Sequence, residues 1–452
     1  MRFFYFGLAL LVALGACKSA RKQQSAPDLM MQTPTGFYSD TLSTGKVDDG
    51  WLETFNDPYL KELVNEGLLN SPSLASAAAN VNAAAGLVII ASSKMKPSLS
   101  IGAPATLEGG TPYSEAVVPG AGAGLALSWE ADIWGKLAAG EAAATNDAVA
   151  TAANYEYGRQ SFVAQISKTY FISIETWLQM KLADSVVNMY ELNHRLVTQQ
   201  LEQGRASKQD LALINSDLAS AKDAFEASRV GHADAKRALE LLLGRYPSAK
   251  IEVPEMLAHV PEYPGSGLPS ELLERRPDII AAERQVGAAF ERVNEAKAAR
   301  LPSLRLDASL AGFLNPASAI WSVGAGFLLP VTQGGALKAN VEIRTFEQEA
   351  AVANYRNVAL NAFGEVESSI NNEMTYQTRE QYLIQVRDNS LEAYNLAMQQ
   401  YKIGAIDLLS TLLLQQRAVS AQKNLISIQT NRLTQRVNTH LALGGSFEEQ
   451  EN

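Results

Sequence analysis

Two halves of this 452-residue chain match each other at an offset of about 200 residues. Self-similarity at a fixed offset indicates that one structural unit occurs twice, so we expect an internal two-fold sequence repeat. Several glycines and prolines recur at equivalent positions of the two halves. The glycines follow strand-like or helical segments, and the prolines begin or end helical segments. These pairs are Gly135 and Gly335, Gly204 and Gly404, Gly244 and Gly444, Pro72 and Pro277, and Pro97 and Pro302.

Each half is predicted to contain a helix of about 24 residues, two strands, a very long helix and a returning helix of roughly 35 residues. Pro72 and Pro277 suit the first position of the shorter helix. The long helical segments cover 137–203 and 337–402. About 65 residues at a rise of 1.5 Å per residue gives roughly 100 Å, several times the length of a helix in a compact domain. The two shorter helices of a half are together as long as this helix, so they are expected to stack end to end beside it.

Segments of alternating apolar and polar residues lie between the first two helices of each half. In one of them, leucines and alanines alternate with Arg305, Asp307 and Ser309. Strands with one apolar face suit a transmembrane barrel, although two hairpins on a soluble core would alternate in the same way. Four strands cannot close a barrel, and lipid does not tolerate open sheet edges, so several chains would have to share it. The expected strands are at about 98–105, 121–134, 303–312 and 322–332.

The uncharged segment 74–93 has the length and composition of a membrane-spanning helix. Its repeat partner, 279–299, contains six charged residues, among them Glu283 and Arg284. Duplicated helices should share an environment, so neither segment is expected to cross lipid.

Residues 1–16 are predicted to be a signal peptide, because Arg2 precedes an apolar segment that is too short to span a bilayer. The small residues Gly15 and Ala16 come directly before Cys17, as at a bacterial lipoprotein processing site. We therefore expect Cys17 to carry a covalent lipid anchor. Residue 18 is lysine rather than aspartate, which permits export onward to the outer membrane. The alternative is a core cysteine behind a retained N-terminus. Residues 17–50 are expected to begin with a lipid-anchored tether, because the segment 18–44 is rich in Ser, Thr, Gln, Gly and Pro.

The sequence offers little support for an enzyme or a nucleic-acid-binding protein. The net charge is −10, and no run of lysine and arginine is long enough to follow a phosphate backbone. The four histidines are scattered, no phosphate-binding glycine loop or serine-nucleophile motif is present, and Cys17 is the only cysteine. We therefore expect no metal, and no cofactor besides the covalent lipid. The segment RRPD at 275–278 is interpreted as a helix start whose arginines tie terminal and linker segments together.

Four segments resemble motifs of one bacterial family, the TolC-like outer-membrane efflux proteins. The resemblance is greatest to their lipoprotein branch, which serves resistance–nodulation–division (RND) pumps, and it runs from about Trp51 to Phe447. The segments are WLETFNDPYL at 51–60, LSWEADIWG at 127–135, GLPSELLERRPDI at 267–279 followed by Ala282 and Glu283, and LGG at 443–445.

This resemblance implies a mixed α/β membrane protein that forms a homotrimer. Each chain would contribute four strands to a twelve-stranded β-barrel in outer-membrane lipid, above a long α-helical barrel in the periplasm. The hairpin tips, near 204 and 404, would contact a periplasmic adaptor (a membrane fusion protein) coupled to an inner-membrane pump, of RND type. The tip residues are Gly204, Ser207, Asp210, Gly404 and Asp407. The resemblance also implies a belt between the repeats, formed by the terminal and linker segments. The expected division is a tether and belt segment at 17–50, a first repeat at 51–247, a linker at 248–266, a second repeat at 267–447 and a tail at 448–452.

The sequence departs from this family at the periplasmic constriction. Many relatives carry an aspartate nine residues after the second tip glycine, where this chain has Leu413, and the usual following arginine is Gln416. Our hypothesis is an apolar constriction at Leu412, Leu413 and Gln416 that closes by packing or dewetting. The alternative is that the leucines at 412–414 only pack between helices.

The expected function is a passive exit duct of a tripartite efflux system. One alternative is the outer-membrane duct of a type I secretion system, which shares the fold. Another, of a different class, is a non-conducting, lipid-anchored periplasmic helical scaffold. The strands distinguish these functions, because a channel places their apolar face in lipid and a scaffold leaves it in water.

Overall fold

The computed structural model describes residues 36–38, 47, 49–103, 105–106, 120–314 and 317–448. The predicted signal peptide, Cys17 and most of the tether lie outside these residues. The chain divides into two units, 1–32 and 33–452, and every element described below belongs to the second.

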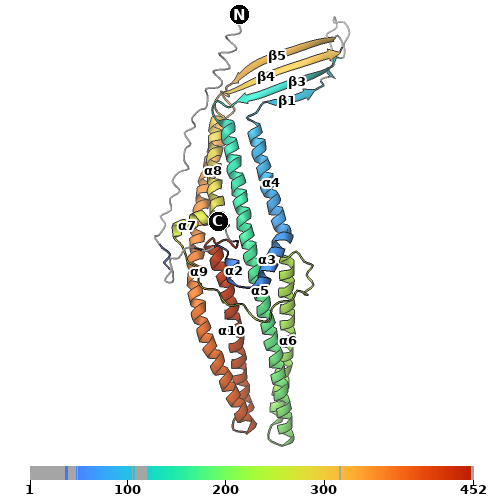
Figure 1. The fold of residues 1–452 in the computed structure, drawn as a ribbon, viewed down its shortest axis with the longest axis vertical. Coiled ribbons are helices and arrows are strands. Elements are labelled where there is room, and N and C mark those ends of the chain that lie inside the picture. Colours follow the sequence, from blue (N-terminus) through green and yellow to red (C-terminus); the bar gives the residue numbers. More distant parts are fainter. Residues whose placement is uncertain are drawn as a thin grey trace. The chain divides into compact units, whose positions relative to one another are not determined.

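Helices and strands follow one another in a similar order in the two halves of the unit (Figure 1). The first half contains α2 (Trp51–Thr54), α3 (Pro58–Asn70), α4 (Pro72–Ser93), β1 (Ser98–Gly102), β2 (Ala105–Thr106), β3 (Gly120–Ala131), α5 (Lys136–Glu202) and α6 (Lys208–Leu242). The second half contains α7 (Pro269–Arg275), α8 (Pro277–Ala298), β4 (Ser303–Leu314), β5 (Ala317–Leu328), α9 (Ala336–Lys402) and α10 (Leu408–Ala442).

Corresponding helices of the two halves are equally long. Helices α5 and α9 have 67 residues each, α6 and α10 have 35, and α4 and α8 have 22. The predicted helix lengths are confirmed. The short helices α2, α3 and α7 were not predicted.

Local hydrogen bonds and glycine conformations set the helix boundaries. Helix α4 begins at a proline, and the hydroxyl of Ser71 accepts a hydrogen bond from the backbone N–H of Leu74 at 3.3 Å. Helices α5 and α9 begin after Gly135 and Gly335, which have φ of 73° and 88°. This left-handed conformation favours glycine. The carboxylate of Asp132 then accepts the first free N–H groups of α5.

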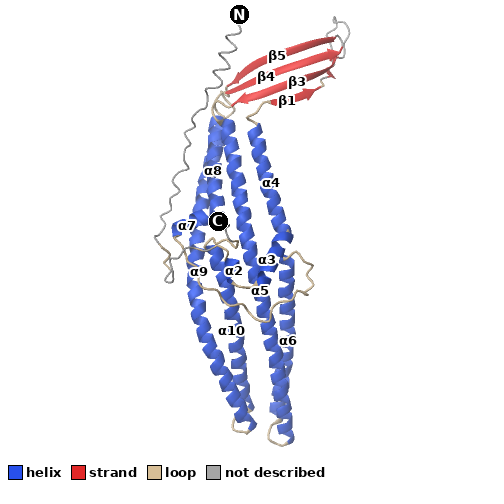
Figure 2. Ribbon diagram, viewed as in Figure 1, coloured by secondary structure: helices blue, strands red, loops and turns tan. Residues whose placement is uncertain are grey.

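The helices of the first half pack against α5 (Figure 2). Helix α4 lies beside the part of α5 nearest the sheet, and α6 lies beside the part nearest the hairpin tip. The expected end-to-end arrangement beside the long helix is therefore confirmed for this half. Helices α8 and α10 also contact α5 and complete the connection to α9.

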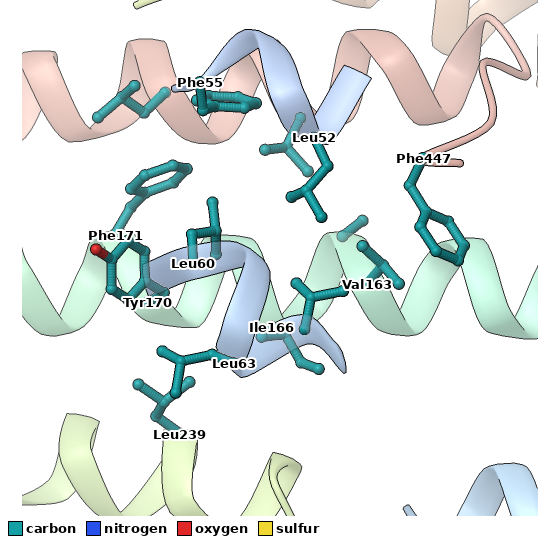
Figure 3. Packing of buried hydrophobic residues seen from close by; sticks show 14 of the residues in the cluster. Leu52, Phe55, Leu60, Leu63, Val163, Ile166, Tyr170, Phe171, Leu239 and Phe447 are labelled. Atoms are coloured by element: carbon teal, nitrogen blue, oxygen red, sulfur yellow. The ribbon is translucent and has the colours of Figure 1, made fainter. Parts of the chain in front are cut away.

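The main apolar core lies where α2, α3, α5, α6 and α10 meet, far from the sheet (Figures 1 and 3). Figure 3 shows Leu63 of α3 between Tyr170 of α5 and Leu239 of α6, with Leu60 beside Tyr170. The Tyr170 hydroxyl donates a hydrogen bond to a carboxylate oxygen of Asp57 at 2.7 Å, so its polar atom is satisfied. Burial of each such large apolar side chain contributes about 1.5–3 kcal/mol.

The sheet is antiparallel, with the strand order β1-β3-β4-β5, and β2 pairs with β3. Its register places Leu127 opposite Ala308 and Leu310 opposite Trp321, on one face. Ser128 lies opposite Asp307 on the other face, where its hydroxyl donates to the Asp307 carboxylate at 2.7 Å. The predicted separation of apolar and polar faces is confirmed.

The strand ends differ from the predicted ones. Strand β3 ends at Ala131 because the next residue, Asp132, caps α5 instead of pairing. Strand β5 ends at Leu328, before Pro330, which has no N–H group to donate. It also begins at Ala317, before the predicted 322, because ladder pairing continues beyond the alternating segment.

Among the described residues, one helix is long and apolar enough to cross a membrane, namely α4, with a mean hydropathy of 1.7. Only 6% of its most apolar window is buried within this chain. Its counterpart α8 buries an apolar face that includes Ile279, Val286 and Val293. Helix α4 packs along α5, which is not itself a candidate span.

Candidate functional site

The two helical hairpins end in turns of the same design. Gly204 follows α5 with φ of 70°, and Gly404 follows α9 with φ of 79°. The next N–H group in each turn reaches back to the helix: Arg205 donates to the carbonyl of Gln200 at 2.8 Å, and Ala405 makes the equivalent bond at 2.9 Å. This pattern ends helices at a left-handed glycine.

The first residues of the returning helices are also fixed by local hydrogen bonds. The Ser207 hydroxyl accepts from the N–H of Asp210 at 3.1 Å, and the Asp210 carboxylate accepts from the N–H of Ser207 at 2.8 Å. Asp407 accepts from the N–H and the hydroxyl of Ser410, at 2.8 and 2.7 Å. These bonds hold the pKa of the Asp407 carboxyl below its usual range. All five predicted tip residues therefore lie at two hydrogen-bonded turns or in the first turn of the helix that follows.

An apolar cluster joins the two hairpins just above their turns. It contains Val197 and Ile214 of the first hairpin and Tyr401, Leu408 and Leu412 of the second. The Tyr401 hydroxyl donates to the side-chain carbonyl of Gln200 at 2.8 Å.

The three candidate constriction residues have different surroundings. Leu412 is buried in this cluster and packs between helices, as the alternative interpretation expects. Leu413 is 51% exposed, and Gln416 is also exposed. The buried polar contact here belongs to Gln415, whose side-chain carbonyl accepts from the amide of Asn193 at 2.8 Å. Within one chain, Leu413 and Gln416 are thus free to line a passage.

The RRPD segment connects distant parts of the chain. Arg275 donates to the Asp49 carboxylate at 2.9 Å and to the carbonyl of Val47 at 3.2 Å. These bonds to the N-terminal segment confirm the interpretation for Arg275, whereas Arg276 bonds to residues of the helices. Arg276 directly precedes α8 and pairs with Asp278 and Glu365, each at 2.7 Å. Burial alone would lower the pKa of the Arg276 guanidinium, but these two acidic partners raise it, so the side chain stays cationic.

A buried ion pair was not predicted from the sequence. Arg436 of α10 pairs with Glu373 of α9 and donates to the backbone carbonyls of Pro261 and Glu262, so it fastens the linker to the helices. The available signal is an arginine within the apolar stripe of α10, between Leu433 and Val437. One turn further on, the ring of His440 is buried, and burial together with the charge of Arg436 lowers its pKa to about 3.

Among the residues that the structure describes, no group of three or more His, Cys, Asp or Glu side chains is placed to hold a metal ion. The predicted lipidation residue, Cys17, lies outside this part of the chain. The site therefore consists of a two-faced sheet, long helical hairpins and two hydrogen-bonded tips.

Comparisons with known proteins agree with this geometry. The family model described as outer membrane efflux protein matches residues 63–245 and 268–445. The antibiotic efflux pump outer membrane protein ArpC of Pseudomonas putida is 30% identical, over 97% of this chain and 94% of its own length. The probable outer membrane lipoprotein SilC of Salmonella typhimurium is 27% identical, over 98% of each chain. The CmeC outer membrane channel of Campylobacter jejuni superposes with a TM-score of 0.86 at 23% identity, over 94% of each chain.

The family model covers well over half of the residues, in two segments that correspond to the two halves of the fold. The chain therefore belongs to the outer membrane efflux protein family and is an outer-membrane channel protein of an efflux system.

Proposed function

We propose that three copies of this chain form the passive exit duct of a tripartite efflux system. The observation that carries the proposal is the sheet, which has one apolar face and two unpaired edges, at β1 and β5. Large apolar residues on that face are exposed in the single chain, among them Leu99, Ile101, Trp321, Val323 and Phe327. Such a face belongs in lipid rather than in water.

The edges require neighbouring copies. An unpaired strand edge in hydrocarbon leaves backbone groups without hydrogen bonds, so a four-stranded sheet is not stable there alone. Two copies would give eight strands, whose interior is filled by side chains, whereas three copies give a twelve-stranded barrel that is wide enough to conduct. In this arrangement the outer edges of β1 and β5 pair with neighbouring chains.

The helices support the same assembly. At 1.5 Å per residue, the 67 residues of α5 and α9 each extend about 100 Å. Helix α4 exposes Leu87, Ile89 and Ile90, at 60%, 69% and 59%. A neighbouring copy would cover this apolar surface and complete a helical barrel. The equal helix lengths of the two halves and the two segments matched by the family model support an origin of this barrel by internal duplication.

We assign the contact with a periplasmic adaptor to the two tips, at Gly204, Ser207, Asp210, Gly404 and Asp407. Both turns are exposed and locally fixed, so they can present one shape to a partner. A photo-crosslinking residue at Lys208 should capture an adaptor in cells, whereas one at Lys222, further along α6, should not. Capture of an adaptor that serves a type I secretion system would favour the secretion alternative over an RND pump.

We assign the lipid anchor to Cys17. SilC, a full-length relative, is described as a probable lipoprotein, which supports this assignment. Mass spectrometry of the mature protein should find acyl chains on an N-terminal Cys17, and Cys17→Ser should lack them. A mature chain that retains residues 1–16 would contradict the assignment.

Planar-bilayer conductance of the purified protein, together with its mass by light scattering, tests the duct. A trimer that conducts in discrete steps is the expected result. A folded chain that never conducts, as wild type or as Leu413→Ser, would favour the scaffold alternative. The Leu413→Ser variant is included because it should open a periplasmic entrance that apolar contacts keep closed.

A further inference from the structure

We propose that each chain carries a binding site for soluble phosphate- or carboxylate-bearing anions at the junction of its helices and its sheet. This inference rests on the proposed function, because the polar face of the sheet faces the passage only in the assembled barrel.

The site is a cavity of about 670 Å³. The ends of α4 and α8, the starts of α5 and α9, and residues of β1, β3 and β4 near these helices line it. All four connections between long helices and strands lie at this junction, so residues that are far apart in the sequence share one surface (Figure 1).

The charge of this cavity contrasts with the acidic chain as a whole. Six cationic side chains line it, against the two carboxylates Glu130 and Glu295. The cationic residues are Lys94, Lys96, Lys136, Arg292, Arg305 and Arg344. Since the whole chain has a net charge of −10, this concentration of positive charge is local.

Half of these cations already have partners. Lys136 pairs with Glu130, Arg292 with Asp147, and Arg344 with Glu347 at 2.7 Å. The structure gives Lys94, Lys96 and Arg305 no ion pair within the described residues. Lys94, Lys96 and Arg305 are also exposed, so their charged groups are free to meet a ligand.

The sheet register shows which face of the sheet the cavity occupies. Glu130 lies opposite Arg305, and Ser98 lies opposite Ser128, all on the polar face. The apolar face, with Leu304 and Leu306, points the other way and would meet lipid. Arg305 therefore faces the passage rather than the lipid headgroups outside the barrel, and Lys94 and Lys96 line the same cavity.

The available groups define the ligand. Lysine supplies a compact charge, and the arginine fork matches phosphate and carboxylate oxygens. The one aromatic residue of the lining, Trp129, lies opposite Leu306 on the apolar face of the sheet, and its indole N–H donates to the carbonyl of Met95 at 2.9 Å. The cavity thus suits multiply charged anions better than neutral aromatic solutes. Three copies would place three such sites around the passage.

The test uses inorganic triphosphate as the probe and the full-length trimer in neutral detergent. Calorimetric titration should detect triphosphate binding to the wild type. The triple variant Lys94→Gln, Lys96→Gln, Arg305→Gln should weaken it at least tenfold, and Arg305→Gln alone by a smaller factor. The control, Lys222→Gln, Arg229→Gln, Arg237→Gln, removes the same charge from α6 and should bind as the wild type does. Circular dichroism and light scattering identify any variant that fails to fold or assemble, in which case Arg305→Gln alone decides.

Conductance in a phosphatidylcholine bilayer provides the second readout. Triphosphate should block the wild type and the control, and the triple variant should need at least tenfold more for the same block. Equal binding by wild type and triple variant would overturn the proposed site even if the channel conducts. Lack of conductance by both the wild type and Leu413→Ser, with triphosphate binding intact, would instead overturn the duct. Competition by phosphatidylglycerol in the detergent would show that lipid phosphate is the occupant and would overturn the assignment to a soluble anion.

Discussion

Replacing Arg436 with methionine should be among the most destabilising single changes in the helical region. The side chains of Arg436 and Glu373 are only 3% and 5% exposed, so the substitution leaves a buried carboxylate without its cation. Breaking a buried ion pair from one side costs about 3–5 kcal/mol. The same change frees the carbonyls of Pro261 and Glu262, so the linker should also detach from α10. The double variant Arg436→Met, Glu373→Met removes both charges and should lose less stability than the single variant.

The assay is urea unfolding of the detergent-solubilised protein, followed by helical circular dichroism. The control is Arg229→Met, which breaks an ion pair whose partners are 56% and 61% exposed and should change the unfolding free energy by about 0–1 kcal/mol. A loss from Arg436→Met no larger than that of the control would refute the reasoning. The reasoning would also be refuted if the double variant were less stable than either single variant.

Further predictions concern His440, two glycines and Leu413. Folding lowers the pKa of His440 from 6.5 to about 3, so between these pH values the unfolded chain binds one proton more than the folded chain. The free energy of unfolding should therefore decrease by up to about 1.4 kcal/mol for each unit that the pH falls below 6.5. His440→Phe should flatten this dependence in urea titrations, and an unchanged slope would contradict it. Gly244→Ala, at φ of 72° with its Cβ 2.8 Å from the Asn70 carbonyl oxygen, should cost about 1–3 kcal/mol. Gly158→Ala, with nothing within 4 Å, should stabilise α5 by about 0.5–1 kcal/mol, and both are measured by the same unfolding assay. Leu413→Ser should increase uptake of small solutes by cells, and unchanged permeability would exclude an apolar closure at this residue.

The sequence predicted most of the regular structure because its signals here are local. Proline at the first helical position and glycine in the left-handed conformation depend only on neighbouring residues, as at Pro72 and Gly135. The alternation from Leu304 to Leu310 likewise predicts its own two faces. The unpredicted helix α2 is only four residues long, and its buried Trp51 stacks on His440, a contact with the far end of the chain.

The polar interactions of the site were harder to predict because they join distant residues. Nothing near Arg436 in the sequence identifies Glu373 or the linker carbonyls as its partners, since the fold brings them together. Leu412 and Leu413 are adjacent in the sequence, but one is buried and the other exposed, because a helix turns each successive side chain by about 100°. The cavity near Arg305 escaped prediction for the same reason, since its lining comes from seven elements.

The two unpaired edges of the sheet also bear on how the protein reaches its membrane. A single copy is unfavourably solvated both in water and in the membrane. In water its apolar face is exposed, and in hydrocarbon the backbone groups at the edges of β1 and β5 would have no hydrogen-bond partners. Membrane insertion and assembly of the chains must then occur together, because a single inserted chain is not a stable intermediate. The rate at which inserted protein appears should therefore rise more steeply than in proportion to the amount of exported chain.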